Sequence, residues 1–167
     1  QLLGGPTGQS FLGSTFPAAP EYAAMIAKDA LAVGELLARE GVLGRFAVDF
    51  LTARTTAGWT PFAIEINLRK GGTTHPFLTL QYLTDGHYDW ESGRFTTPFS
   101  EQKHYIASDH LEKAAYRSLD AEAVFDVAVN EGLHFDHTRE TGCVFHMMTA
   151  LGDRGRLGLT AIGNTPG

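Results

Sequence analysis

The sequence is poor in cysteine and has no long apolar run. Its single cysteine, Cys143, cannot form an internal disulfide, which is compatible with a reducing compartment. No apolar run approaches the roughly 20 residues that cross a bilayer, and no basic segment followed by an apolar one opens the chain. These absences argue against a membrane protein and predict a cytoplasmic location.

Positive charge is also scarce. The chain has 13 Lys and Arg residues against 19 Asp and Glu residues, for a net charge of -6. Binding to a phosphate backbone requires a basic surface, so we do not expect nucleic acid as a partner. The 167 residues, 43% of them hydrophobic, predict one globular domain. Because the chain starts at Gln1 and stops just after a predicted strand, we expect a fragment of a longer protein.

Alternating helix and strand patterns predict an α+β fold with a mainly antiparallel sheet. Glycines and prolines in residues 4–17 indicate a hairpin, and apolar spacing predicts a helix over residues 21–40 that stops at Gly41. The remaining expected elements are strands at 45–54 and 61–68, a short helix at 77–83, a strand at 103–107, a helix at 120–131, and strands at 144–149 and 157–162.

The strands at 45–54 and 61–68 are expected to pair as a hairpin that turns near Ala57. In the second strand, the apolar residues at positions 62, 64, 66 and 68 would share one face and pack on a core, because strand side chains alternate. On the other face, Asp49 would lie opposite Glu65 and diagonal to Asn67. A register slipped by one residue would separate them.

Asp49, Glu65 and Asn67 together offer the hard oxygen ligands that Mg²⁺ takes in proteins. Two carboxylates that face each other repel, so a cation or a hydrogen-bond donor is needed to keep both ionised. This pattern predicts a site for one or two divalent ions. The alternative interpretation is a solvated polar face on an edge hairpin.

Arg69 and the loop Gly71, Gly72, Thr73 and Thr74 follow directly on the same face. Glycines let backbone amides approach an anion, and the guanidinium adds a charged donor. This order suits a reaction in which metal-bound phosphates meet a second anionic group. His75, which comes next, is a candidate substrate contact or acid/base group, unless its ring only braces the loop.

Three other features carry no assigned chemistry. Cys143 and His146 lie three apart in a strand-like run, which places them on opposite faces and argues against a nucleophile and its base. Asp109 is interpreted as the N-cap of a helix that includes Glu112. The aromatic, irregular residues 85–100 are either part of an acceptor pocket or a cover over the core.

Residues 45–50 (RFAVDF) and 63–69 (AIEINLR) resemble the metal-binding strands of ATP-grasp ligases. The segments 65–76 (EINLRKGGTTHP), 3–10 (LGGPTGQS) and 141–146 (TGCVFH) are similar to the C-terminal portion of pheganomycin-type peptide ligases and related carboxylate-amine ligases. The resemblance implies that residues 1–167 form a C-terminal ATP-grasp subdomain. It would comprise a glycine-rich hairpin (1–17), a metal-binding hairpin (44–69) and a C-terminal extension (102–167).

The resemblance also implies roles for individual residues. Asp49, Glu65 and Asn67 would bind Mg²⁺ and position ATP, with Glu65 bridging two ions, and Arg69 would contact the acyl phosphate. The loop 71–74 would hold substrate. The implied activity joins a carboxylate to an amine with ATP, and the half that completes the ATP site would precede Gln1, so this part alone should not be competent.

Two alternatives stay open. The chain could be a non-catalytic peptide- or protein-binding module derived from such a half. A calcium-stabilised structural domain is weaker, because it leaves Arg69 and the glycine loop without a role.

Overall fold

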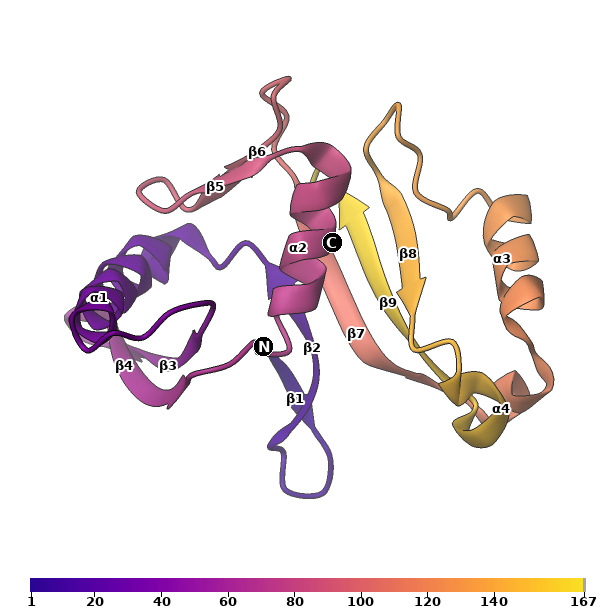
Figure 1. Cartoon of the computed structure of the whole chain (residues 1–167), viewed down its shortest axis with the longest axis horizontal. Helices are drawn as coiled ribbons and strands as arrows, with labels where there is room; N and C mark the ends of the chain where they lie inside the picture. The colour runs from indigo at the N-terminus through magenta and orange to yellow at the C-terminus, as the bar shows by residue number, and fades with distance from the viewer. Residues whose placement is uncertain (167) are drawn as a thin grey trace.

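A computed structural model describes residues 1–166 and shows an α+β fold, as expected. Five strands form one antiparallel sheet in the order β1-β2-β7-β9-β8 (Figure 1). Their bounds are β1 Leu2–Gly4, β2 Ser10–Phe16, β7 His104–Glu112, β8 Gly142–His146 and β9 Arg156–Gly163. No helix within residues 1–166 combines the length and apolar character needed to cross a bilayer.

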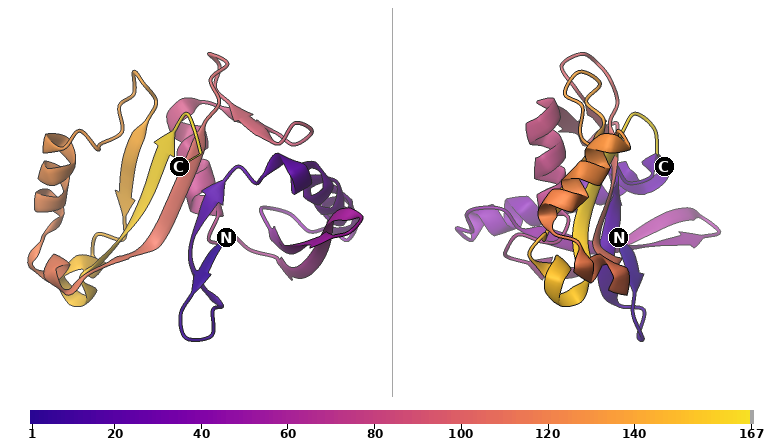
Figure 2. Two further views of the ribbon diagram at one scale, coloured as in Figure 1. Left: turned by 180° about the vertical axis from the view of Figure 1, so that it is seen from behind. Right: turned by 90° about the vertical axis from the view of Figure 1, so that its right-hand side faces the viewer.

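Helix α2 (Thr74–Thr84) lies across one face of this sheet, as the two views of Figure 2 show. The short strands β5 (His87–Asp89) and β6 (Arg94–Thr96) form a hairpin that inserts Phe95, which is 1% exposed, into the same core. Tyr88 and Phe95 within residues 85–100 therefore cover the core, in agreement with the second alternative for this part of the segment. The buried members of this core are Leu80, Phe95, Tyr105, Ala107 and Ile162.

The opposite face of the sheet carries a second core. Strand alternation places Leu157 of β9 and Phe145 of β8 on that face. They pack with Val124 of helix α3 (Ala121–Asn130) and Leu151 of helix α4 (Ala150–Arg154). A 3-10 helix, Ala114–Ser118, lies nearby in this core. The helix predicted at 120–131 is confirmed, and the Asp120 side chain caps it by accepting a hydrogen bond from the Ala123 amide.

A separate two-stranded hairpin, β3 (Ala47–Thr55) and β4 (Gly58–Asn67), packs against helix α1 (Pro20–Arg39) on the left of Figure 1. The Tyr22 ring of α1 meets the Trp59 ring of β4 edge to face, with centroids 5.2 Å apart. The Phe46 ring lies against Gly34 of the helix. Helix α1 thus covers one face of the hairpin, and both predicted strands and the predicted helix are confirmed.

The prediction that residues 62, 64, 66 and 68 share one apolar face of β4 is wrong, because the strand contains a β-bulge. Pairing runs regularly from Thr55 and Gly58 to Phe50 and Ala63, but the next pair is Asp49 with Glu65, so Ile64 is the extra residue. Because the bulge shifts the alternation by one, Phe62 and Ile66 point to opposite faces. The exposed fractions are 49% for Phe62, 65% for Ile64, 47% for Ile66 and 59% for Leu68.

Candidate functional site

The hairpin brings the three predicted oxygen ligands to one face. Asp49 pairs with Glu65, and Ala47 pairs with Asn67 at the next position on the same face. The predicted pairing of Asp49 with Glu65 is therefore confirmed, but it arises from a bulge that the sequence pattern did not show. The two-residue turn at 56–57 would by itself set Asp49 opposite Ile64, and the bulge at Ile64 restores the pairing with Glu65.

The chemistry of this set fits a hard divalent cation. Asp49 is half-buried and accepts a hydrogen bond of 2.9 Å from the Gln1 side-chain amide, while Glu65 is exposed. Solvent access leaves room for the water and phosphate oxygens that complete the coordination of Mg²⁺. Within residues 1–166, no three His, Cys, Asp or Glu side chains group as a metal site, so the third protein ligand here would be the Asn67 amide oxygen.

Arg69 follows β4 on the surface. Its amide donates to the Asn67 carbonyl at 2.7 Å, and its guanidinium Nη1 donates to the Lys70 carbonyl at 3.2 Å. The Arg69 side chain is exposed. It is therefore free to turn towards an anion bound beside the hairpin.

The loop 71–74 is the start of helix α2 and connects the hairpin to the sheet. The Gly71 amide donates to the Thr74 hydroxyl oxygen at 3.1 Å, so this amide is already engaged within the loop. A side chain at Gly72 would press against the Phe11 ring of β2, and one at Gly71 would approach the Ala47 side chain of β3. The contact with Phe11 leaves little room for a side chain at Gly72, and the approach of Gly71 to Ala47 places the loop beside the hairpin that carries Asp49, Glu65 and Asn67.

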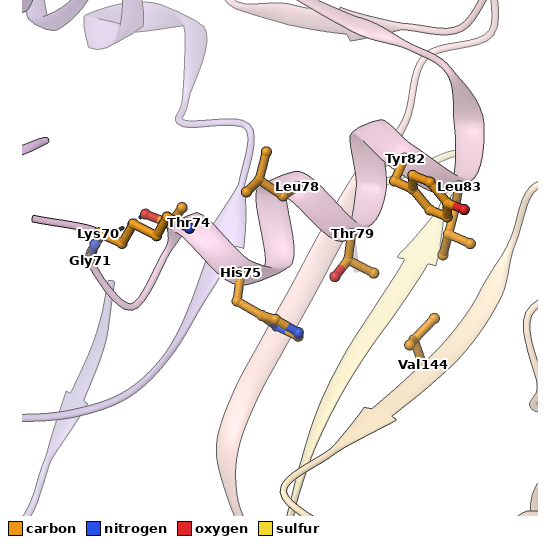
Figure 3. A pocket seen from close by; sticks show the side chains of 9 residues that line it. All are labelled: Lys70, Gly71, Thr74, His75, Leu78, Thr79, Tyr82, Leu83 and Val144. Atoms are coloured by element: carbon orange, nitrogen blue, oxygen red, sulfur yellow. Dashed lines mark hydrogen bonds between the residues drawn. The ribbon is translucent and has the colours of Figure 1, made fainter. Parts of the chain in front are cut away.

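A mainly apolar groove of about 510 Å³ runs along helix α2 towards β8. In Figure 3, the His75 and Thr79 side chains point from the helix towards the strands, and Val144 of β8 faces them. The lining residues are Lys70, Gly71, Thr74, His75, Leu78, Thr79, Tyr82, Leu83 and Val144. The loop 71–74 thus opens onto a space that can accept an apolar group.

A second cavity of about 200 Å³ lies between the glycine loop, β2 and the ends of β7 and β8. Its lining includes Phe11, Gly72, Asp109 and His146. His75 lines both cavities and is itself exposed. A molecule in either cavity can therefore contact its imidazole.

His75 meets two residues that were not assigned a role from the sequence. Its ring lies 4.7 Å from the His146 ring, centroid to centroid, and His146 Nε2 is hydrogen-bonded to Asp109 Oδ1 at 2.9 Å. Partial burial lowers the pKa of His75 and the charge of His146 lowers it further, while the Asp109 carboxylate acts in the opposite direction. His75 therefore stays neutral to a lower pH than a free imidazole.

The interpretation of Asp109 as a helix cap is wrong, because Asp109 and Glu112 both belong to strand β7. The expectation for β8 is confirmed, since alternation puts Cys143 and His146 on opposite faces. His146 is on the α2 face, which is why it reaches His75. No spacing rule connects positions 75, 109 and 146, so the pattern held no signal for this cluster.

Two similarities to known proteins accompany this geometry. Residues 123–167 match the PGM1 C-terminal domain family. Over 160 residues the chain is 28% identical to an L-propargylglycine–L-glutamate ligase of Streptantibioticus cattleyicolor, covering 96% of this chain and 32% of that ligase. The chain thus spans about a third of the length of the curated relative it matches. No solved structure matches the chain.

Both similarities support the resemblance to the C-terminal portion of an ATP-grasp ligase that the motifs indicated. The identity is low, and the family match covers only the last part of the chain. Accordingly, they support the ligase family at a coarse level and assign no role to any single residue.

Proposed function

We propose that this chain is the metal-holding part of an ATP-dependent ligase that joins a carboxylate to an amine. The observation that carries the proposal is the hairpin register, which sets Asp49 opposite Glu65 and beside Asn67. The glycine loop that begins α2 adjoins the same hairpin. Because the relative is named for joining two amino acids, we propose amino acids or peptides as the two substrates.

Asp49, Glu65 and Asn67 would hold one or two Mg²⁺ ions, with Glu65 shared between them. Bound Mg²⁺ would neutralise the phosphate charge of ATP in this site. The substrate carboxylate takes the terminal phosphoryl group of ATP, ADP leaves, and the amine then replaces the phosphate to give an amide. The Arg69 guanidinium would stabilise the acyl phosphate and the oxyanion formed during attack.

The substrates would lie along the N-terminal end of α2. The loop Gly71, Gly72, Thr73 and Thr74 would hold the reacting group, and the groove along α2 would take an apolar side chain. His75, which lines both cavities, would contact the substrate as an acid/base group. Since such a ligase draws on the cellular ATP pool, we propose a cytoplasmic location.

The N-terminal half of the same ligase is the proposed partner of this chain. The relative is about three times as long as the matched region, and the hairpin exposes the apolar residues Leu51, Phe62 and Ile64. A two-stranded hairpin with exposed apolar side chains gains stability when another element covers it. We propose that this half covers the hairpin, supplies the rest of the ATP site, and is needed for turnover.

The assignment is tested by Glu65→Ala and Asn67→Ala in the complete protein. Each change removes an oxygen ligand from an exposed face, so ATP turnover should be abolished while circular dichroism and thermal unfolding stay as in the wild type. Glu91→Ala, which removes an exposed carboxylate from the loop between β5 and β6, is the matched control and should keep full activity. Wild-type turnover in the Glu65 and Asn67 variants would end the metal assignment.

A further inference from the structure

Asp109 and His146 come from strands that are not neighbours, because β9 lies between β7 and β8. On one side of β9, His146 pairs with Gly158. On the other side, Ser108 pairs with Leu159 and Leu111 with Leu157, so the bulged residues Asp109 and His110 together oppose Gly158. The carboxylate and the imidazole therefore approach each other across a glycine in the central strand.

Gly158 is what allows this approach. A side chain at this position would overlap the His146 imidazole. With only a hydrogen there, His146 Nε2 lies 2.9 Å from Asp109 Oδ1 above the strand. The Asp109 backbone carbonyl accepts a 2.7 Å hydrogen bond from Arg156 Nε, which holds the bulge in place. The contact between Asp109 and His146 is thus built into three adjacent strands.

His75 lies against this pair. Its ring is tilted by 53° to the His146 ring, and a hydrogen bond from His146 to the Asp109 carboxylate requires a proton on His146 Nε2. The His146 Nδ1 atom is buried and has no hydrogen-bond partner within residues 1–166. The other ionisable side chains lining the cavities at His75 are Lys70 and Tyr82. His75 is the exposed member of the cluster, and the other two are partly covered.

We propose that Asp109 and His146 are positioning residues that hold His75 as the base for the amine substrate. This inference rests on the proposed ligase function. As the amine nitrogen forms a bond to the acyl carbon, the bond from that carbon to the phosphate oxygen breaks, and phosphate leaves with the electron pair. The nitrogen loses one proton, which moves to the unprotonated ring nitrogen of His75.

The cluster of Asp109, His146 and His75 gives His75 the protonation state, orientation and access that a base for the amine needs. The imidazole must be neutral before attack, and the neighbouring His146 ring opposes its protonation. The ring must also keep its orientation, and its contact with the His146 imidazole limits its rotation. Because His75 borders both cavities, the base stays accessible to the amine.

The first test measures the His75 pKa directly and does not depend on ligase activity. NMR titration of labelled histidines in the complete protein should give a His75 pKa below the ordinary 6.5. His146→Gln should raise this pKa, because it removes a ring that opposes protonation, and Asp109→Asn should lower it. His137→Gln, an exposed histidine, is the control and should leave it unchanged. An unchanged His75 pKa in both cluster variants would overturn the inference.

The second test separates the base from the phosphorylation step. His75→Gln should reduce amide formation by about 10²-fold or more, while ADP formation from the carboxylate substrate persists. Because kcat falls as the base is protonated, the acid limb of the kcat profile should move to higher pH in His146→Gln and to lower pH in Asp109→Asn. Two residues with a merely structural role would not move the acid limb in opposite directions. An acid limb that stays in place in both variants would overturn the inference.

Gly158→Ala provides a third variant if a cluster substitution fails to fold. It displaces the His146 ring without removing it, so it should move the His75 pKa in the same direction as His146→Gln. Gly152→Ala, at a position with open space, is its matched control. If Glu65→Ala keeps full activity but the His75 pKa responds as expected, the proposed function fails while the coupling within the cluster stands.

Discussion

Arg69 is the residue that connects the oxygen ligands of the hairpin to the glycine loop. It lies two positions after Asn67 and two before Gly71, and its side chain is exposed. In the proposed role its positive charge stabilises negative charge that develops in the reaction, whereas an exposed Arg adds little to folding stability. Its contribution should therefore be seen in catalysis and not in folding.

We expect Arg69→Ala to slow amide formation by about 10²-fold or more in the complete protein, because it removes a preorganised partner of the oxyanion. Product formation is measured by the rate of amide release, and thermal unfolding checks the fold. Arg54→Ala, an exposed arginine near the other end of the same hairpin, is the control and should retain the wild-type rate. Equal rates in both variants would contradict the role of Arg69.

At the scale of elements, the β3–β4 hairpin depends on its turn and on its bulge. The turn leads into Gly58, whose φ of 116° is a left-handed conformation that favours glycine. The bulge at Ile64 then corrects the register between turn and ligands. The turn and the bulge together decide whether Asp49 pairs with Glu65, because a change of register at the turn is transmitted along both strands.

Gly58→Ala is expected to destabilise the hairpin by about 1–2 kcal/mol, because alanine is strained at this φ. Hydrogen exchange of the β3 and β4 amides should speed up accordingly. Gly152→Ala in helix α4 makes the same chemical change at a position without positive φ or close neighbours, and should be neutral or stabilising by less than about 1 kcal/mol. If the β3 and β4 amides exchange at the same rate in the Gly58→Ala and Gly152→Ala variants, the turn does not require glycine at position 58.

At the scale of the whole molecule, the apolar surface is unevenly distributed. The five-stranded sheet has a core on each face, whereas the hairpin is covered on one face by α1 and leaves Leu51, Phe62 and Ile64 exposed. A cluster of this kind on one element is typical of an interaction surface. It lies on the element that carries the proposed metal ligands, which is where a second half would complete an ATP site.

Ile64→Glu should weaken the association of this chain with the proposed N-terminal half by at least about 10-fold, because a charge would be buried at the contact. Isothermal titration measures the association, and MgADP should bind only when both parts are present. Leu43→Glu, which changes a leucine that is 95% exposed before β3, is the control and should associate as the wild type does. Equal affinity of the two variants would argue for a different partner surface.

Much of the local structure could be predicted because its causes are local. Periodic apolar residues and Gly41 define α1, and Asp120 caps α3. The pairing of Asp49 with Glu65 was predicted from a turn near Ala57. The turn at residues 56–57 would by itself pair Asp49 with Ile64, and the bulge restores the pairing with Glu65. A bulge is a property of the pairing between two strands, so the alternation along β4 alone does not reveal it.

The sequence by itself determined the α+β class, the helices α1, α2 and α3 and the motif that resembles the ATP-grasp ligases, because periodicity and motif spacing act over a few residues. Only the tertiary structure decided that Asp109 is in a strand, that Lys103 is fully buried among Glu101, Asn164 and the Arg139 carbonyl, and that His75 meets His146. The contact of His75 with His146 joins residues far apart in the chain, and His146 reaches Asp109 across β9, which has a glycine at the crossing point.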